Sequence, residues 1–228
     1  MKLSTNGYEI NIFYTVLLVL TYMIIGLIIP TALNSSLWRP MGGALPEWLN
    51  IFTLIAVNVI FFIGAARITG YKLTIFQNTT ITGILLAIAC SVLFFLLLDN
   101  FLDPIFDRIF PASAIEYEEM LITLRKFPAA TFIRVCLFAP ITEEILMRGF
   151  VLGGLQKKYG VIIALVVSTL LFAILHFNFV QTLSAVVCGL VLGLLYIKTG
   201  SLFCPILAHV LYNSISYYTV IIKGGVTL

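Results

Sequence analysis

Two histidines, His176 and His209, are the only ones among the 228 residues, and each lies within a long apolar segment. The same half of the chain holds an adjacent acidic pair, Glu143 and Glu144. Ionisable side chains are costly inside apolar segments of helix length, so where they occur they mark candidate functional sites. Carboxylates and imidazoles are the groups that most often move protons in catalysis. The sequence therefore indicates acid–base chemistry at these residues.

The acidic pair begins a motif that contains its own cation, Arg148. Glu144 and Arg148 are four residues apart, a spacing that pairs side chains on one helix face, whereas Glu143 is rotated by about 100°. We expect Arg148 to compensate Glu144 and to leave Glu143 free to take a proton. An ionic lock that only fixes helix packing is the alternative. Pro140 predicts that the helix is broken or kinked and restarts at about Ile141.

Two further pairs at a spacing of four share a helix face, Phe172 with His176 and His209 with Asn213. The second pair predicts an imidazole and a carboxamide side by side. A single histidine in an apolar helix is usually a core residue with a satisfied hydrogen bond. Because both histidines accompany a buried Glu pair, we favour a site.

The elements that must position these residues are membrane-spanning helices. The mean hydropathy is +1.11, 61% of the residues are hydrophobic and only 10% are charged. Apolar runs of roughly 18 to 20 residues match the length that a helix needs to cross a bilayer. We expect an all-α, polytopic bundle of about seven spans, forming one transmembrane domain over 1–228 with a motif-bearing core over about 127–222. The expected spans are 10–29, 49–66, 80–98, 127–153, 161–177, 179–197 and 202–222.

The helix rise of about 1.5 Å per residue allows Glu143, His176, His209 and Asn213 to share one layer near the middle of the bilayer. The polar stretch from Asp99 to Lys126 is expected to form an interfacial or extramembrane helix and loop.

The distribution of basic residues in the loops gives the expected orientation, with the N-terminus on the cytoplasmic side of the cell membrane. The first span is expected to be a retained anchor rather than a cleaved signal peptide. The expected inner residues are Lys2, Arg67, Lys72, Lys157, Lys158 and Lys198, and the expected outer ones are Arg39, Arg108, Arg125, Lys126 and Lys223.

Two classes of function are disfavoured. The net charge of +3 arises from short loops rather than from a basic face, so nucleic acid is not an expected partner. Cys90, Cys136, Cys188 and Cys204 lie in apolar segments without a CxxC spacing, which argues against disulfides or a thiolate zinc site.

The ordered set Glu-Glu-x-x-x-Arg at 143–148, Phe-x-x-x-His at 172–176 and His-x-x-x-Asn at 209–213 resembles the motifs of the CAAX protease and bacteriocin-processing (Abi) family. This family contains intramembrane proteases related to the prenyl endopeptidase that trims CaaX proteins. The resemblance implies that Glu143 and His176 activate a water molecule, while His209 and Asn213 stabilise the oxyanion.

The same resemblance leaves the cofactor open between two readings. Glu143, His176 and His209 are also a ligand set for a catalytic zinc. Because no HExxH motif is present and the ligands would come from three separate helices, we favour water activation with no required metal.

The implied substrate is a hydrophobic or membrane-delivered peptide. It would be a prenylated CaaX tail in a eukaryote or archaeon, or a peptide pheromone or bacteriocin precursor in a bacterium. The alternative function is a non-proteolytic membrane adaptor that contacts a sensor histidine kinase through its helices. Gly189 and Gly193 form a Gly-x-x-x-Gly that supports close packing, which we expect to be internal. An ion-coupled transporter fits the polar residues but not the order of the motifs.

Overall fold

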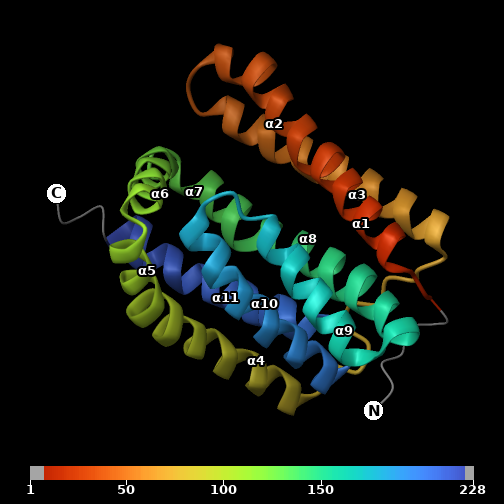
Figure 1. The fold of residues 1–228 in the computed structure, drawn as a ribbon. Coiled ribbons are helices and arrows are strands. Elements are labelled where there is room, and N and C mark those ends of the chain that lie inside the picture. The colour runs from red at the N-terminus through yellow and green to blue at the C-terminus, as the bar shows by residue number, and fades with distance from the viewer. Residues whose placement is uncertain (1–7, 224–228) are drawn as a thin grey trace.

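The computed structural model describes residues 8–223 and is a bundle of helices, with no strand in that part of the chain (Figure 1). The α-helices are α1 (Ile12–Tyr22), α2 (Ile29–Leu33), α3 (Leu45–Thr69), α4 (Ile81–Phe94), α5 (Asp103–Ile109), α6 (Pro111–Leu124), α7 (Pro128–Thr131), α8 (Ala139–Glu144), α9 (Gly153–Ile174), α10 (Phe179–Thr199) and α11 (Phe203–Tyr217). Wider π-helical turns link several of them, at Met23–Ile28, Asn34–Trp38, Phe95–Leu102, Phe132–Phe138 and Ile145–Leu152, and Tyr218–Lys223 follows α11. The short 3₁₀ turn Arg39–Met41 ends the first helical stretch.

Five helical stretches are long and apolar enough to cross a membrane: Ile12–Met41, Leu45–Thr69, Ile81–Ile109, Pro128–Ile174 and Phe179–Thr199. The stretch Pro128–Ile174 is two helices, because Gly160 adopts a φ of 79° and turns the chain back on itself. A last helical stretch runs through α11 to Lys223. The chain thus makes seven helical passages, in agreement with the expectation of about seven spans. Lys2, on which part of the expected orientation rests, lies outside the described residues.

The first helix continues well beyond its expected end at 29 and reaches Met41, while α3 begins at Leu45 rather than 49. The polar run after Pro30 suggested a loop. In the structure, the Thr31 and Ser36 hydroxyls donate to the carbonyl oxygens four residues earlier, which satisfies both hydroxyls within the helix. The two long helices pair as a hairpin that lies along one side of the remaining bundle (Figure 1).

The expected extramembrane segment from Asp99 to Lys126 is shorter than the sequence suggested, because the third span continues to Ile109. Asp99 accepts a hydrogen bond of 2.8 Å from the Tyr212 hydroxyl, and Asp103 accepts one from Ser184. These acids therefore face α10 and α11 inside the bundle. Only α6 and its connections lie outside the candidate spans in this part of the chain.

The expected break at Pro140 was wrong. Phe138 and Ala139 keep helical backbone angles, and the chain passes from the π-helical turn Phe132–Phe138 directly into α8. Proline has no N–H to donate, and a wider π-helical turn immediately before it accommodates the missing bond without ending the helix. Glu143 accordingly lies within a continuous helix rather than in the first turn of a new one.

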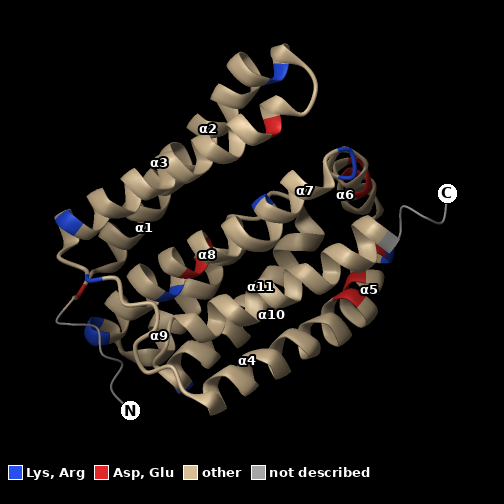
Figure 2. Cartoon of the chain, turned by 180° about the vertical axis from the view of Figure 1, so that it is seen from behind, with Lys and Arg blue, Asp and Glu red and all other residues tan. Residues whose placement is uncertain are grey.

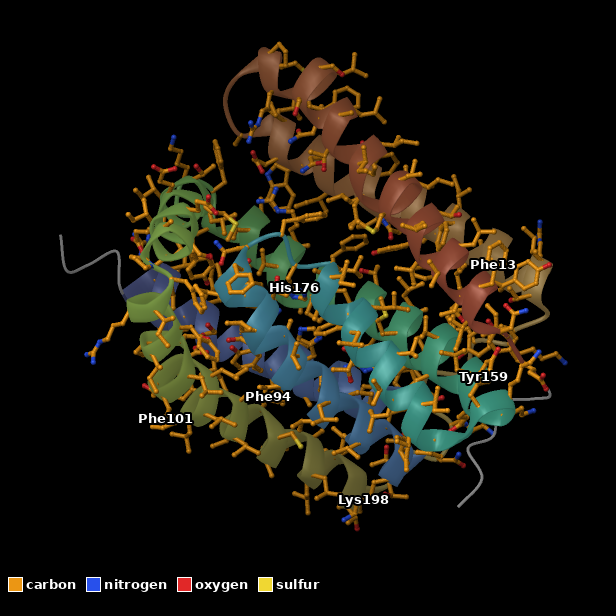
Figure 3. All side chains as sticks on the ribbon, viewed as in Figure 1. Phe13, Phe94, Phe101, Tyr159, His176 and Lys198 are labelled. Atoms are coloured by element: carbon orange, nitrogen blue, oxygen red, sulfur yellow. The ribbon has the colours of Figure 1, made fainter. Side chains whose placement is uncertain are left out.

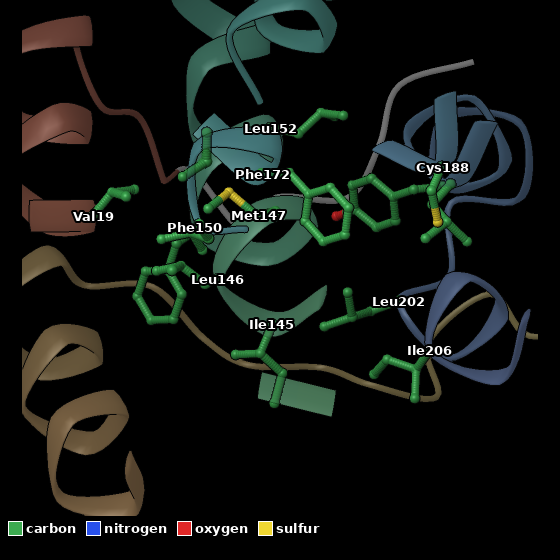
Figure 4. Close-up of a cluster of buried hydrophobic side chains, with 14 of the residues drawn as sticks. Val19, Ile145, Leu146, Met147, Phe150, Leu152, Phe172, Cys188, Leu202 and Ile206 are labelled. Carbon is green, nitrogen blue, oxygen red and sulfur yellow. The ribbon is translucent and has the colours of Figure 1, made fainter. Parts of the chain in front are cut away.

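The core lies between α9, α10, α11 and the segment that follows α8, and it includes Met147, Phe172 and Leu202 (Figure 4). Most charged residues lie toward the helix ends, but α8 carries charge in the middle of the bundle (Figure 2). All four cysteines are free, as expected.

The Gly-x-x-x-Gly of α10 packs internally, as expected. A Cβ at Gly189 would lie 3.1 Å from the Phe172 ring and 3.4 Å from the Thr169 backbone, and one at Gly193 would collide with Leu165. Both glycines thus let α10 approach α9 closely.

Gly189→Val should destabilise the protein by about 1–3 kcal/mol, because the added side chain overpacks the contact between α9 and α10. The measurement is thermal unfolding of the purified protein in detergent. Gly64→Val is the matched control, since Gly64 is also in a helix interior but no described atom lies within 4 Å of the place that a Cβ would take there. Equal unfolding temperatures for the two variants would contradict the close approach.

Candidate active site

The Glu144–Arg148 pair lies at the centre of the site, and both side chains are 0% exposed. Arg148 Nε is 3.0 Å from Glu144 Oε2, as the spacing predicted. Arg148 Nη2 donates a 3.0 Å hydrogen bond to the Gly189 carbonyl of α10, and the guanidinium carbon lies 4.7 Å from the centroid of the Phe172 ring of α9. Arg148 thus connects its own helix to α10 through a hydrogen bond and to α9 through the contact with the Phe172 ring.

His209 of α11 is the second partner of Glu144. Its Nδ1 lies 3.0 Å from Glu144 Oε1, and because an ionised carboxylate only accepts hydrogen bonds, Nδ1 carries the proton. The other ring nitrogen, Nε2, lies 3.9 Å from Glu143 Oε2. At 3.9 Å this contact is too long for a hydrogen bond, so Nε2 is not bonded to Glu143. Nε2 can donate to another group only when both ring nitrogens carry protons.

Glu143 is the more accessible of the two acids, with a side chain that is 21% exposed. It lines a cavity of about 310 Å³ between the N-terminal hairpin and α8, together with Tyr22, Thr142 and Phe138. Arg148 thus pairs with Glu144, as their spacing predicted, and Glu143 borders the cavity. That Glu143 takes a proton stays a prediction.

His176 lies just after the C-terminal end of α9 (Figure 3). Its Nδ1 lies 3.1 Å from the Phe172 carbonyl oxygen, which can only accept, so Nε2 is left as an acceptor in the neutral ring. The Phe172 ring contacts both imidazoles, with centroid distances of 5.0 Å to His176 and 5.8 Å to His209. No direct interaction joins His176 to Glu143 within the described residues.

The spacing of four predicted that the Asn213 amide lies beside the His209 imidazole, but in the structure this amide is hydrogen-bonded to another segment. Its Nδ2 donates a 3.0 Å hydrogen bond to the Val135 carbonyl in the π-helical turn before α8. The second N–H of the amide is not used by this bond. The part of Asn213 in oxyanion stabilisation stays a prediction.

The zinc alternative has no preformed site. No group of three or more His, Cys, Asp or Glu side chains within residues 8–223 is arranged to hold a metal ion. Only Glu143 and His209 of the three candidate ligands approach each other, and at 3.9 Å. The interpretation in which no metal is required stays a prediction.

Four polar residues of the cavity were missed by the sequence reasoning. Asn34, Arg39, Asn50 and Arg134 line it beside Glu143. The available signal was the same one that identified the histidines, namely isolated polar side chains in apolar helix-length segments.

Gly149, next to Arg148, has a packing role. A Cβ at this position would lie 2.8 Å from the Tyr71 hydroxyl, so a larger residue there would require the Tyr71 side chain to move. Burial raises the pKa of that hydroxyl.

Comparison with known proteins agrees with the position of these motifs. Residues 125–215 match the family model described as type II CAAX prenyl endopeptidase Rce1-like. The chain is 32% identical over 75 residues to the putative membrane peptidase YdiL of Bacillus subtilis, which covers 33% of this chain and 31% of the relative. It is 33% identical over 104 residues to the membrane-embedded CAAX protease MroQ of Staphylococcus aureus, which covers 42% of this chain and 41% of the relative.

The matched segments thus span less than half of either relative, and no solved structure matches the chain. Together with the candidate spans, the bacterial relatives identify an integral, multi-pass protein of a bacterial membrane.

Arg148→Ala should lower stability by about 3–5 kcal/mol, because it leaves the Glu144 carboxylate buried without its cation. Thermal unfolding in detergent and the protein level in membranes measure the loss. Arg108→Ala is the control, since Arg108 is exposed, and its effect should stay within about 0.5 kcal/mol. A stable Arg148→Ala protein would contradict the importance of the pair.

Proposed function

We propose that this chain is an intramembrane endopeptidase of the type II CAAX prenyl endopeptidase Rce1-like kind, whose family model residues 125–215 match, and that it cleaves a hydrophobic or membrane-delivered peptide by glutamate-activated water. One observation carries the proposal. The Glu143 carboxylate lines a cavity and lies 3.9 Å from an imidazole, while its neighbour Glu144 is fully neutralised.

In the first step, Glu143 takes a proton from water while the water oxygen attacks the peptide carbonyl carbon. His176 Nε2, an acceptor because Nδ1 is bound to the Phe172 carbonyl, orients the same water. The carbonyl π electrons move to oxygen, and the resulting oxyanion accepts hydrogen bonds from the His209 imidazolium and from the second N–H of Asn213.

In the second step, the C–N bond breaks and Glu143 returns the proton to the leaving amine. Glu144 acts in both steps through His209, because its carboxylate accepts the bond from Nδ1–H and so holds the ring in place. In this scheme Glu144 is a positioning residue. For the substrate we propose a peptide pheromone or bacteriocin precursor.

Glu143→Gln should lower peptide cleavage by roughly 10²–10⁴-fold without lowering the unfolding temperature, because it removes the general base but keeps the side-chain shape. The measurement is cleavage of a fluorogenic hydrophobic peptide by the purified protein. Glu119→Gln on the exposed surface of α6 is the control and should leave cleavage unchanged. Full activity in the Glu143→Gln protein would exclude this mechanism.

A chelator should not change turnover by the purified protein, since the scheme assigns every proton transfer to side chains. The measurement is the cleavage rate after dialysis against 1,10-phenanthroline and again after zinc is added back. Lost activity that zinc restores would instead show that a metal is required and would contradict this scheme.

The adaptor alternative predicts a different result in cells. The Glu143→Gln His176→Ala double variant should behave like a deletion strain and accumulate an uncleaved precursor, with membrane levels matched by immunoblot. A wild-type phenotype would assign the function to helix contacts with a partner such as a membrane histidine kinase.

A further inference from the structure

A polar groove leads away from Glu143 between the N-terminal hairpin and the motif helix. The cavity that Glu143 lines adjoins a second cavity of about 380 Å³, because Arg39 and Arg134 line both. The second cavity also contains Glu47 and Lys126. The two cavities meet at these arginines and together form one groove from the proposed catalytic acid to the end of the hairpin.

The far part of this groove has an excess of positive charge. Arg39, Lys126 and Arg134 line it, against one carboxylate, Glu47. Glu47 lies 3.4 Å from Arg134 and neutralises part of that cation. No carboxylate within the described residues forms an ion pair with Arg39 or Lys126. The groove therefore suits an anionic group.

The stretch nearer Glu143 carries amides rather than charges. Asn34 is only 8% exposed, lines the groove and has a buried Oδ1 that no described residue engages in a hydrogen bond. Asn50, also buried, lines the same cavity from the other helix of the hairpin. An unpaired buried carbonyl is costly, so a ligand that donates an N–H to it gains binding energy. The backbone of an extended peptide supplies such donors.

We propose that this groove binds the part of the substrate that leaves with the new amine, and that Arg39 and Arg134 bind its terminal carboxylate. The proposal rests on the proposed function. Arg134 and Glu143 are nine residues apart on one helix, which corresponds to about 13 Å of rise. An extended peptide covers that distance in about four residues. Paired arginines are the side chains best suited to bind a carboxylate.

An anionic lipid headgroup has similar charge and is the competing occupant. The peptide is favoured because the groove ends at Glu143 and is lined by amides, whereas a headgroup site has no need of either. The two occupants differ in what they require: the peptide needs a free C-terminal acid, and the headgroup needs a charged lipid.

The test is a binding measurement that does not depend on cleavage. Trp38 and Trp48 are the only tryptophans of the chain, and both lie in the hairpin within two residues of Arg39 or Glu47. Energy transfer from them to a dansylated hydrophobic hexapeptide reports binding near the groove. The Glu143→Gln protein in neutral maltoside micelles is titrated with the peptide as a free acid and as its C-terminal amide.

The acid should bind about tenfold more tightly than the amide, a difference of about 1.4 kcal/mol. Arg39→Gln, which breaks no ion pair among the described residues, should remove most of this preference, and Arg39→Gln with Arg134→Gln should abolish it. Glu47→Gln should increase the preference because it releases Arg134. Arg67→Gln, an exposed arginine at the opposite end of α3, is the matched control and should change nothing.

Equal affinity for acid and amide would overturn the proposal. So would displacement of both peptides alike by phosphatidylglycerol, which would identify a headgroup site. The outcome is separable from that of the protease proposal: a protein that prefers the acid but cleaves nothing with Glu143 restored would retain the groove as a carboxylate site and contradict the proposed hydrolysis.

Discussion

The buried pair of Glu144 and Arg148 is the constraint on which the rest of the site depends. Two opposite charges inside an apolar bundle are tolerated only when each has its partners, and here the partners come from different helices. Arg148 requires the Gly189 carbonyl of α10, and Glu144 requires the imidazole of His209 on α11. Satisfying this one pair therefore fixes how the motif helix, α10 and α11 are rotated against one another.

The same requirement explains the position of Phe172. Its ring packs against the guanidinium group of Arg148 and contacts both imidazoles, so it separates His176 from His209 while holding each in place. Gly189 completes the arrangement, because any side chain there would push the ring away. The residues beside the proposed acid are thus closely packed, and the accessible side of Glu143 faces the cavity beside the hairpin.

The spacing of residues along a helix predicted contacts between residues of that same helix. The Glu144–Arg148 pair follows from the helix repeat. Phe172 and His176 are in contact, but His176 lies just beyond the end of α9 rather than on the same helix face. Contacts between helices did not follow: the bond from His209 to Glu144, and the turn of Asn213 toward Val135, depend on rotation and π-helical turns that a single sequence does not display. The class of fold and the approximate number of spans were predictable because both follow largely from hydropathy, although the division of Pro128–Ile174 into two passages depends on the turn at Gly160.

The errors at the span boundaries had one physical cause. Polar residues that suggested loops form their hydrogen bonds inside helices or between them.

The π-helical turn Phe132–Phe138 has a consequence for chain length among relatives. Such a turn is equivalent to one extra residue in an α-helix. A chain one residue shorter there could close an ordinary α-turn and still present the acidic pair to its histidine. Alignment gaps just before the Glu-Glu motif are therefore compatible with an intact active centre.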